Sequence, residues 1–280
     1  MTYNGEAIFN EDGSIRKVQE GEDGRSYSSN LAKLLKQLPK LQNLQEGKPP
    51  SPVMAHISLT NACNLTCSFC CFANRDISEK MPTEKVFQAL ESFKAIGVTG
   101  VEFTGGGEPS IHPHFKEIVQ YAKDLGFSLG ICTNGARFGA DRPIKKDIVE
   151  LFDWVRLGMY GFYEGYDYDL SVFEGTNCKP SAAYVWDENL ETSKNPNITG
   201  DWSDVKNKRV LSKKFQTTEN FIRMLDWVEE NGIPCRIAFN AIKDVKETEK
   251  DIETIRGIIE HYEEDRGRKL KYAFLSDFNF

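Results

Sequence analysis

The chain has 280 residues, a length that suits two ordinary domains or one barrel with extensions. Hydrophobic residues make up 40% of it and charged residues 28%, which excludes the disordered, collagen-like and coiled-coil classes. The 35 basic and 42 acidic side chains give a net charge of −7, so we expect no nucleic-acid partner. The sequence shows neither a long apolar run nor a signal-like start, and we expect a cytoplasmic protein without membrane attachment.

Residues 1–50 are predicted to form an N-terminal arm and a helix. Residues 6–18 alternate as two short strands around an Asp-Gly turn. Leucines then recur at helical spacing from Leu31 to Leu41, with Pro39 as an expected kink. A Gly-Lys-Pro-Pro stretch ends this helix, and the core domain is predicted over residues 51–280.

Short apolar runs and amphipathic segments alternate through the core. The predicted strands are residues 53–59, 100–103, 128–132, 154–157, 235–239 and 270–275. The predicted helices are residues 83–96, 113–125, 144–152, 218–231 and 247–266. Such alternation implies a parallel sheet, so the fold class is α/β, a partial (β/α)6 TIM-like barrel with an N-terminal extension. Ligands of such a sheet bind at the carboxyl ends of its strands.

An insertion, residues 161–214, interrupts this alternation after the fourth strand. The segment is too long for an ordinary connection and is rich in aromatic and acidic side chains. One interpretation is a small subdomain that uses the aromatic side chains as a local core. The other is a lid or a wall of a substrate-binding site.

Three cysteines follow the first predicted strand. Cys63, Cys67 and Cys70 have C-x-x-x-C-x-x-C spacing, which favours three thiolates on one centre. Soft thiolates select zinc or an iron-sulfur cluster. A structural zinc needs four ligands, and Cys71 is a poor fourth because adjacent side chains in an extended segment point apart, so it is expected to be a buried neighbour. Three ligands on a four-iron cluster leave one iron open to a small molecule.

A glycine-rich segment, residues 105–109, follows the second strand. Glycines let the backbone approach a ligand closely, since no Cβ intervenes. A dinucleotide-binding motif is excluded because Ser110 stands where that motif needs its last glycine. Two histidines near the next helix, His112 and His114, suggest surface or capping roles rather than a metal site.

Together these motifs resemble the radical S-adenosylmethionine (radical SAM) superfamily, over roughly residues 53–280. The resemblance implies that Cys63, Cys67 and Cys70 ligate a [4Fe-4S] cluster whose fourth iron is chelated by S-adenosylmethionine (SAM). The further cofactor-binding residues that it suggests are Phe69, Gly106, Gly107, Glu108, Pro109, Thr133, Asn134, Arg156 and Asn240. Arg156 could instead pair with an acidic side chain. The fourth strand departs from a common family pattern, with Gly158 in place of serine and Tyr160 in place of aspartate.

The family's activity is reductive cleavage of SAM to a 5'-deoxyadenosyl radical, which abstracts hydrogen from a substrate. The resemblance therefore implies a one-electron reductant such as flavodoxin or ferredoxin. Cys178, or a tyrosine of the insertion, is a candidate to return a hydrogen atom to the product radical, against ordinary packing. A peptide or protein is the first choice of substrate, because the arm and the acidic, aromatic insertion offer an extended contact surface. The alternatives are a nucleoside or other small metabolite and, in a different class, a non-catalytic iron-sulfur sensor.

Overall fold

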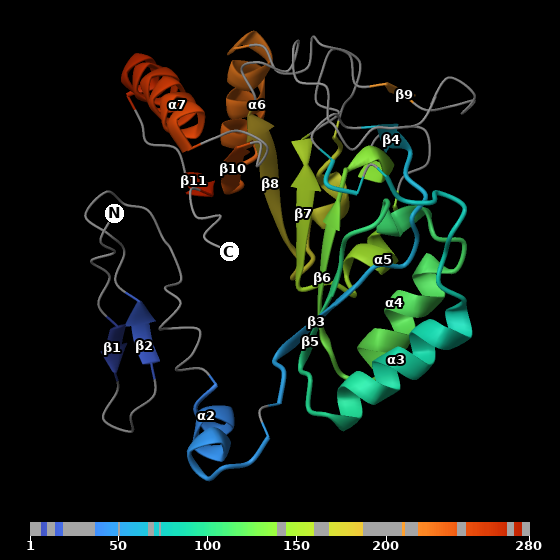
Figure 1. Cartoon of the computed structure of the whole chain (residues 1–280). Coiled ribbons are helices and arrows are strands. Elements are labelled where there is room, and N and C mark those ends of the chain that lie inside the picture. The colour runs from blue at the N-terminus through green and yellow to red at the C-terminus, as the bar shows by residue number, and fades with distance from the viewer. Residues whose placement is uncertain are drawn as a thin grey trace.

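The computed structural model describes the backbone of residues 7–9, 15–18, 37–49, 51–66, 70–72, 74–138, 144–159, 168–186, 209–210, 218–239, 245–267 and 272–275. These residues build an α/β fold around one large parallel sheet (Figure 1), which confirms the predicted class. Of the helices in these ranges, none is both long enough and apolar enough to cross a bilayer.

The sheet has seven strands within the described ranges, in the order β11-β10-β8-β7-β6-β5-β3, and each neighbouring pair is parallel. In chain order the strands are β3 (Met54–Ile57), β5 (Gly100–Phe103), β6 (Ser128–Thr133), β7 (Trp154–Gly158), β8 (Lys179–Trp186), β10 (Cys235–Phe239) and β11 (Tyr272–Leu275). Because all the strands run in one direction, their carboxyl ends share one edge of the sheet.

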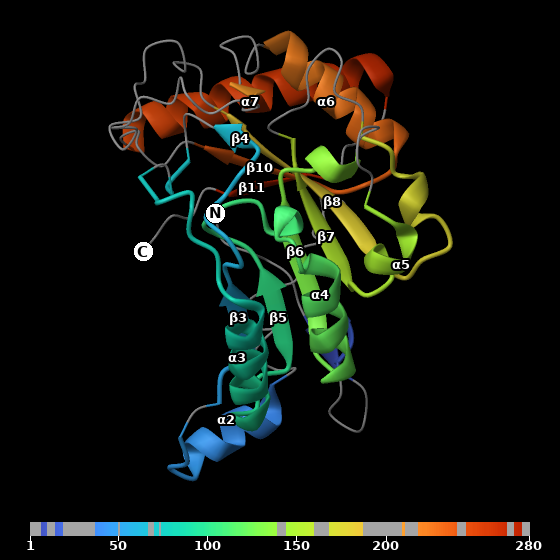
Figure 2. The ribbon, with the colours of Figure 1, turned by 90° about the vertical axis from the view of Figure 1, so that its right-hand side faces the viewer.

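Helices cover one face of this sheet, as Figure 2 shows for α3, α4 and α5 in front of the strands. The helices of the core are α3 (Thr83–Ala95), α4 (Phe115–Asp124), α5 (Lys146–Val149), α6 (Thr218–Glu230) and α7 (Val245–Arg266). Glycines with positive φ follow α3, α4 and α6 at Gly97, Gly126 and Gly232, as the sequence predicts.

The helix-covered face is apolar. Phe103 of β5 is fully buried, and its ring centroid lies 6.5 Å from that of Phe115 and 6.3 Å from that of Phe152. Farther along the sheet, Tyr184 of β8 packs against Phe221 of α6 at 5.3 Å. In β5, β6 and β7, alternate residues thus point into one hydrophobic core, and their neighbours point to the opposite face.

Strand β8 corrects the sequence prediction of six strands. It lies inside the segment 161–214 that was expected to be an insertion, and it pairs with β7 and β10. No amphipathic helix precedes it, because the connection from β7 contains only the short 3-10 helix η4 (Ser171–Phe173) in its described part. Without that helix, the strand gave no βα signal in the sequence.

The described aromatic side chains of the same segment pack as core. Tyr168, Phe173 and Tyr184 are all buried. They belong to the same hydrophobic core as the sheet and its helices, so the expectation of a separate local core is wrong for these residues. Most of the remaining segment, residues 161–167 and 187–208 included, lies outside the described residues, and the lid remains a prediction.

The N-terminal part contains the expected hairpin and a helix that overlaps the predicted one at residues 38–41, while residues 31–36 lie outside the described ranges. Strands β1 (Ala7–Phe9) and β2 (Ile15–Val18) pair antiparallel, and in Figure 1 they lie on the side of the sheet away from α3 and α4. Helix α2 (Leu38–Gln45) carries Pro39 in its first turn, so the predicted kink is wrong there. Proline suits this position because the first turn has no intrahelical acceptor for its missing N–H.

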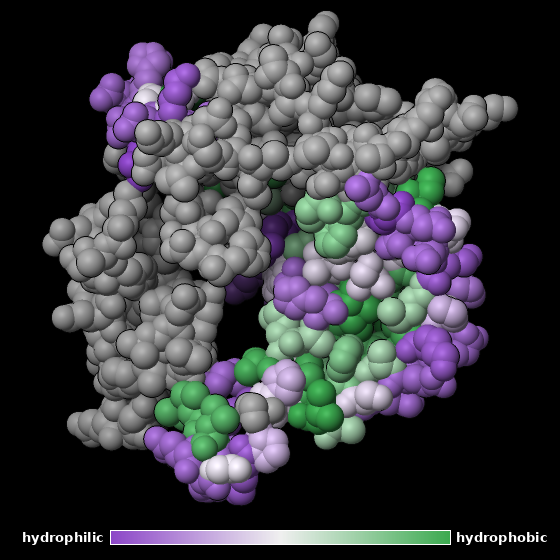
Figure 3. All heavy atoms as spheres, viewed as in Figure 1, coloured by the Kyte–Doolittle hydropathy of each residue, from purple (hydrophilic) through white to green (hydrophobic). Residues whose placement is uncertain are grey.

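Exposed apolar side chains gather at the amino edge of the sheet, over α2 and the nearby ends of β3 and α3 (Figure 3). They are Leu38, Leu44, Val53, Met54 and Ile96. The Lys40 ammonium of α2 donates to the carbonyls of Pro52 and Gly97, at 2.7 Å each. These contacts attach α2 to the edge opposite the carboxyl ends of the strands.

Replacement of Leu90 in α3 tests the position of the core. The side chain is 0% exposed, so Leu90→Ala should lower the free energy of unfolding by about 2–5 kcal/mol. The same change at Leu44, which is 47% exposed in α2, should stay within about 0.5 kcal/mol. Urea unfolding of both variants measures the difference, and equal losses would contradict this assignment of the core.

Candidate functional site

The cysteine loop, residues 58–72, begins directly after β3 at the carboxyl edge of the sheet. Cys63 and Cys70 are half-buried. Cys67 and Phe69 lie outside the described residues. Cys71 is exposed, so the expectation that it is a buried neighbour is wrong. The loop thus places at least two of the three predicted ligands at the ligand-binding edge of the fold.

The glycine loop, residues 105–109, packs against the cysteine loop backbone to backbone. The amide of Gly107 donates to the carbonyl of Thr60 at 2.7 Å, and the amide of Glu108 donates to that of Ala62 at 2.9 Å. A Cβ on Gly107 would lie 1.7 Å from the Ala62 carbonyl oxygen, and one on Gly106 would lie 2.2 Å from a side-chain oxygen of the cysteine loop. The absence of Cβ atoms therefore permits this contact between the two loops.

The Glu108 carboxylate joins the ends of β5 and β6. Its side chain is buried, at 2% exposure, and Oε1 accepts from the hydroxyls of Ser110 and Thr133 at 2.6 and 2.7 Å. Oε2 accepts from the amide of Asn134 at 2.7 Å. Hydrogen bonds to a carboxylate are stronger than neutral ones, so Glu108 acts as a clamp between two strand ends. Pro109, the first residue of the 3-10 helix η1 (Pro109–Ile111), is buried beside it.

Asn134 connects β6 to the cysteine loop. Its Nδ2 donates to Asn64 Oδ1 at 2.7 Å and lies 3.8 Å from Cys63 Sγ. Its Oδ1 accepts from the amide of Ala136 at 3.0 Å, which fixes the orientation of the side chain. The amide N–H is thereby directed at a predicted cluster ligand.

Tyr168 supports the same edge and was not singled out from the sequence as a site residue. Its hydroxyl lies within hydrogen-bond distance of the carbonyls of Gly158, at 3.1 Å, and Asn134, at 3.3 Å. Its ring occupies the space beside Gly135, where a Cβ would lie 2.1 Å from the ring. Tyr168 lies in an irregular segment, and no pattern of residue spacing in the sequence predicts such a contact there.

Arg75 is a second site residue that sequence reasoning missed. Its Nε donates to the carbonyl of Asn61 at 2.6 Å, and one of its terminal nitrogens donates to the carbonyl of Phe72 at 2.6 Å. The same nitrogen lies 3.5 Å from Cys70 Sγ. A lone arginine five positions after the last motif cysteine belongs to no motif from which this role follows.

The face of the sheet opposite the core carries a polar row just below the loops. Cys132 of β6 donates to Glu102 of β5 at 3.1 Å and accepts from Arg156 of β7 at 3.3 Å. His56 of β3 lies 3.8 Å from the second oxygen of Glu102. The Arg156 guanidinium also lies 5.2 Å from the ring centroid of Trp154. Four neighbouring strands therefore present polar groups on this face.

The Cys132 thiol is held neutral. Burial raises its pKa to about 12, the positive charge of Arg156 opposes the rise, and the hydrogen bond to Glu102 adds to it. At neutral pH the group is a thiol that donates its proton, rather than a thiolate nucleophile.

Cys178 does not fit the expected role of a hydrogen donor. It directly precedes β8, at the amino end of that strand, whereas the cysteine and glycine loops lie at the carboxyl ends. Burial raises the pKa of its thiol to about 12. The residue is packed at the wrong edge of the sheet, and ordinary packing accounts for it. Asn240 lies outside the described residues.

His112 is a structural residue, and of the two expected roles only capping fits it, because it is buried rather than on the surface. Its Nδ1 accepts from the amide of His114 at 3.2 Å, so the proton lies on Nε2, which bonds the carbonyl of Met81 at 3.1 Å. Burial lowers its pKa, which favours the neutral ring. His114 is exposed and pairs with Glu117 at 3.1 Å.

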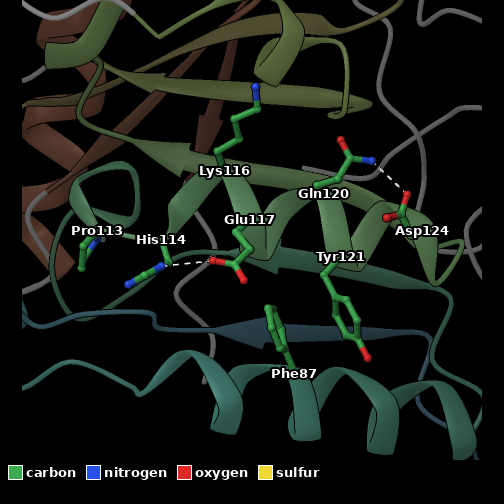
Figure 4. Close-up of a pocket in the computed structure, with 8 residues that line it drawn as sticks. All are labelled: Phe87, Pro113, His114, Lys116, Glu117, Gln120, Tyr121 and Asp124. Atoms are coloured by element: carbon green, nitrogen blue, oxygen red, sulfur yellow. Dashed lines mark hydrogen bonds and ion pairs between the residues drawn. The ribbon is translucent and has the colours of Figure 1, made fainter.

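A groove of 570 Å³ lies on the outer helical layer between α3 and α4 (Figure 4). Its floor is formed by the rings of Phe87 and Tyr121, whose centroids are 4.2 Å apart. Its rim carries the His114–Glu117 pair. The groove contains no thiol and does not adjoin the glycine loop, so it is separate from the candidate site.

The donor set fits an iron-sulfur cluster. Within the described ranges no three His, Cys, Asp or Glu side chains come together as a metal site, and the middle cysteine of the motif, Cys67, falls outside those ranges. The sulfurs of Cys63 and Cys70 each have an N–H donor nearby, from Asn134 and Arg75. Hydrogen bonds to thiolate sulfur are typical of cluster ligands.

The comparisons agree with this site. The sequence profile of the radical SAM superfamily matches residues 57–164. The S-adenosylmethionine-dependent nucleotide dehydratase of Selenomonas ruminantium is 31% identical over 98 residues, 35% of either chain. The sporulation killing factor maturation protein SkfB of Bacillus subtilis is 34% identical over 85 residues, 30% of this chain and 20% of SkfB. The chain therefore spans well under two thirds of these relatives.

A solved structure shares the fold. SuiB of Streptococcus suis, bound to S-adenosylmethionine, has a TM-score of 0.54 at 20% identity, over 89% of this chain and 56% of SuiB. Residues 57–164 of the chain therefore match the radical SAM superfamily, and the SuiB structure shows that the chain shares its fold.

Gly107→Ala tests the contact between the two loops. The added methyl group meets backbone atoms of Ala62, which no side-chain rotation can relieve, so the cysteine loop must shift. We expect a loss of iron after anaerobic reconstitution, measured per chain by a ferrous-iron assay. Gly257→Ala is the control, because a Cβ there has nothing within 4 Å. Full iron content in Gly107→Ala would contradict the contact.

The neutral state of Cys132 predicts slow alkylation. With a pKa of about 12, only roughly one thiol in ten thousand is ionised at pH 8. Iodoacetamide should therefore label the exposed Cys71 well before Cys132 in cluster-free protein, as followed by peptide mass spectrometry. The Cys132 rate should keep rising as the pH approaches 12. Equal rates at pH 8 would show that the thiol is accessible and ionised.

Proposed function

We propose that Cys63, Cys67 and Cys70 hold a [4Fe-4S] cluster and that the chain uses it for radical SAM catalysis on a peptide or protein. The observation that carries this proposal is the cysteine loop at the carboxyl edge of the sheet, fixed to the glycine loop and supplied with N–H donors at two of its sulfurs. The motif spacing and the superfamily match support it.

When bound, the cluster would supply one electron to the sulfonium of SAM, and the cleavage would release methionine and provide the 5'-deoxyadenosyl radical for hydrogen abstraction from the substrate. The contribution of the chain is to place these groups and to exclude water. Gly106, Gly107 and Asn134 lie at the edge where SAM would bind. Phe69 and Asn240 are proposed contacts by resemblance. The electron would come from a reductant such as flavodoxin or ferredoxin.

Two further residues, Arg156 and Thr133, are proposed to contribute to the SAM site in different ways. Arg156 would contact the methionyl carboxylate, since its guanidinium lies on the polar face and bonds Cys132 rather than a carboxylate among the described residues. The hydroxyl of Thr133 donates to Glu108, so Thr133 would position the end of β6 at the SAM site rather than donate its hydroxyl to SAM.

A peptide substrate is supported by the position of the short strand that follows β8 in the described part of the chain. Strand β9 (Arg209–Val210) pairs in parallel with β4 (Leu65–Thr66), which lies inside the cysteine loop. One described part of the segment that was predicted to be a substrate wall therefore lies beside the cysteine loop. The structure of SuiB bound to its precursor peptide SuiA resembles this chain with a TM-score of 0.53 at 16% identity over 93% of its length. The acidic side chains of the segment suit a basic peptide.

A small metabolite is the second candidate, supported by the nucleotide dehydratase of Selenomonas ruminantium. The neighbouring genes are first searched for a short precursor peptide, and turnover of such a peptide is then compared with turnover of a panel of nucleotides. Product formation from the peptide alone is the expected result. Product formation from a nucleotide alone would replace the peptide proposal.

The catalytic proposal predicts formation of 5'-deoxyadenosine. Anaerobically reconstituted protein, reduced with dithionite and supplied with SAM, should release 5'-deoxyadenosine, measured by liquid chromatography. Alanine at Cys63, Cys67 or Cys70 should abolish release. Cys178→Ala is the control and should retain it. Protein that loads iron but never cleaves SAM would favour an iron-sulfur sensor, and colourless protein that contains zinc would exclude both.

The substrate wall is tested by Trp186→Ala and Tyr166→Ala. Each should weaken substrate-dependent turnover and leave SAM binding unchanged, because the proposed contacts involve substrate alone. Binding of SAM is measured by equilibrium dialysis, and turnover by product formation. Equal loss of both would contradict a role in substrate binding.

A further inference from the structure

We infer that Arg75 is a positioning residue that closes the cysteine loop and donates a charged hydrogen bond to the Cys70 sulfur once that sulfur is a cluster ligand. The inference rests on the proposed function for the identity of the ligand. The closure of the loop is independent of it, because the contacts exist without a bound group.

Arg75 joins the two ends of the ligand-bearing segment. Asn61 lies before the first cysteine and Phe72 lies after the last, and the guanidinium bonds the carbonyls of both at 2.6 Å. One side chain therefore spans the whole C-x-x-x-C-x-x-C segment. The Phe72 carbonyl also accepts from the Arg75 backbone amide at 3.2 Å, so the contact of the side chain with the Asn61 carbonyl is the one that reaches across the segment. These contacts also limit how far Cys63 and Cys70 can separate.

The guanidinium nitrogen that bonds Phe72 also lies 3.5 Å from Cys70 Sγ. A positive charge and an N–H donor at a ligating thiolate stabilise added negative charge. Because reduction adds negative charge to a cluster, such a donor raises its reduction potential. Partners of this kind commonly affect metal affinity as well.

The two described sulfurs have unlike neighbours. Cys63 lies 3.8 Å from the neutral amide of Asn134, which belongs to the end of β6. Cys70 lies near the charged Arg75, which belongs to the cysteine loop itself. The positive charge therefore lies at the C-terminal end of the cysteine motif. Removal of the Arg75 charge should affect the cluster without disturbing the hydrogen bonds of Glu108.

Lysine cannot replace Arg75 fully. A guanidinium presents several N–H groups in a fixed planar arrangement, whereas an ammonium is a single point donor. Lysine can keep the positive charge near Cys70 and lose one of the two carbonyl anchors. The pair Arg75→Lys and Arg75→Met therefore separates the charge from the geometry, and Arg223→Met, at an exposed position of α6, is the matched control.

The experiment uses three measurements on the full chain. Hydrogen exchange of peptides that cover residues 61–76 is measured in cluster-free protein. Iron release to a ferrous chelator and the midpoint potential, from a redox titration followed by electron paramagnetic resonance, are measured after reconstitution. Circular dichroism and thermal unfolding show whether each variant keeps the fold.

For Arg75→Met we expect faster exchange in this segment, iron release faster by about 10- to 100-fold, and a more negative midpoint potential. Arg75→Lys should show faster exchange with a smaller shift of the potential, and the control should match the unchanged protein. Exchange and iron release that are both unaltered in Arg75→Met would overturn the inference. If Arg75→Met loses its fold, Arg75→Lys decides by the same measurements. Failure of the unchanged protein to take up iron would contradict the proposed function alone, since the exchange experiment still decides the closure.

Discussion

The site depends on one close approach of two backbones, where Gly107 meets the carbonyl of Ala62. The amides of the glycine loop donate to carbonyls of the cysteine loop across this contact, so the thiols are fixed relative to the end of β5. The glycine motif was expected to approach a ligand. In the structure it first approaches the loop that bears the predicted ligands, and any cofactor would bind to this combined surface.

The remaining contacts extend this constraint along the carboxyl edge. Glu108 connects the ends of β5 and β6, Asn134 reaches the cysteine loop, and Tyr168 joins the ends of β6 and β7. Below them the two faces of the sheet have different characters: Phe103 lies in the core, and its neighbour Glu102 faces Cys132. The helices stabilise the sheet from one side, which leaves polar groups available on the other.

Periodic and clustered signals were predictable from the sequence. Strands such as β5 and β10 are short, mostly apolar segments between helices, and the cysteine spacing marks its loop directly. Features that depend on contacts between distant segments were not predictable. Strand β8 is identified by its pairing with its two neighbouring strands, and the role of Arg75 is identified by the carbonyls to which it donates. Cys178 is excluded as a hydrogen donor because β8 begins directly after it, which places it at the amino edge of the sheet. No local pattern carries that information, because each of these roles is fixed by tertiary packing.

The most direct test of the account is the electron paramagnetic resonance spectrum of the reduced, anaerobically reconstituted protein with and without SAM. Three protein thiolates leave one iron open, so about four irons per chain should bind and SAM should change the spectrum of the cluster. A spectrum that SAM leaves unaltered would contradict binding of SAM at an open iron, and a bound zinc in place of iron would equally contradict the account.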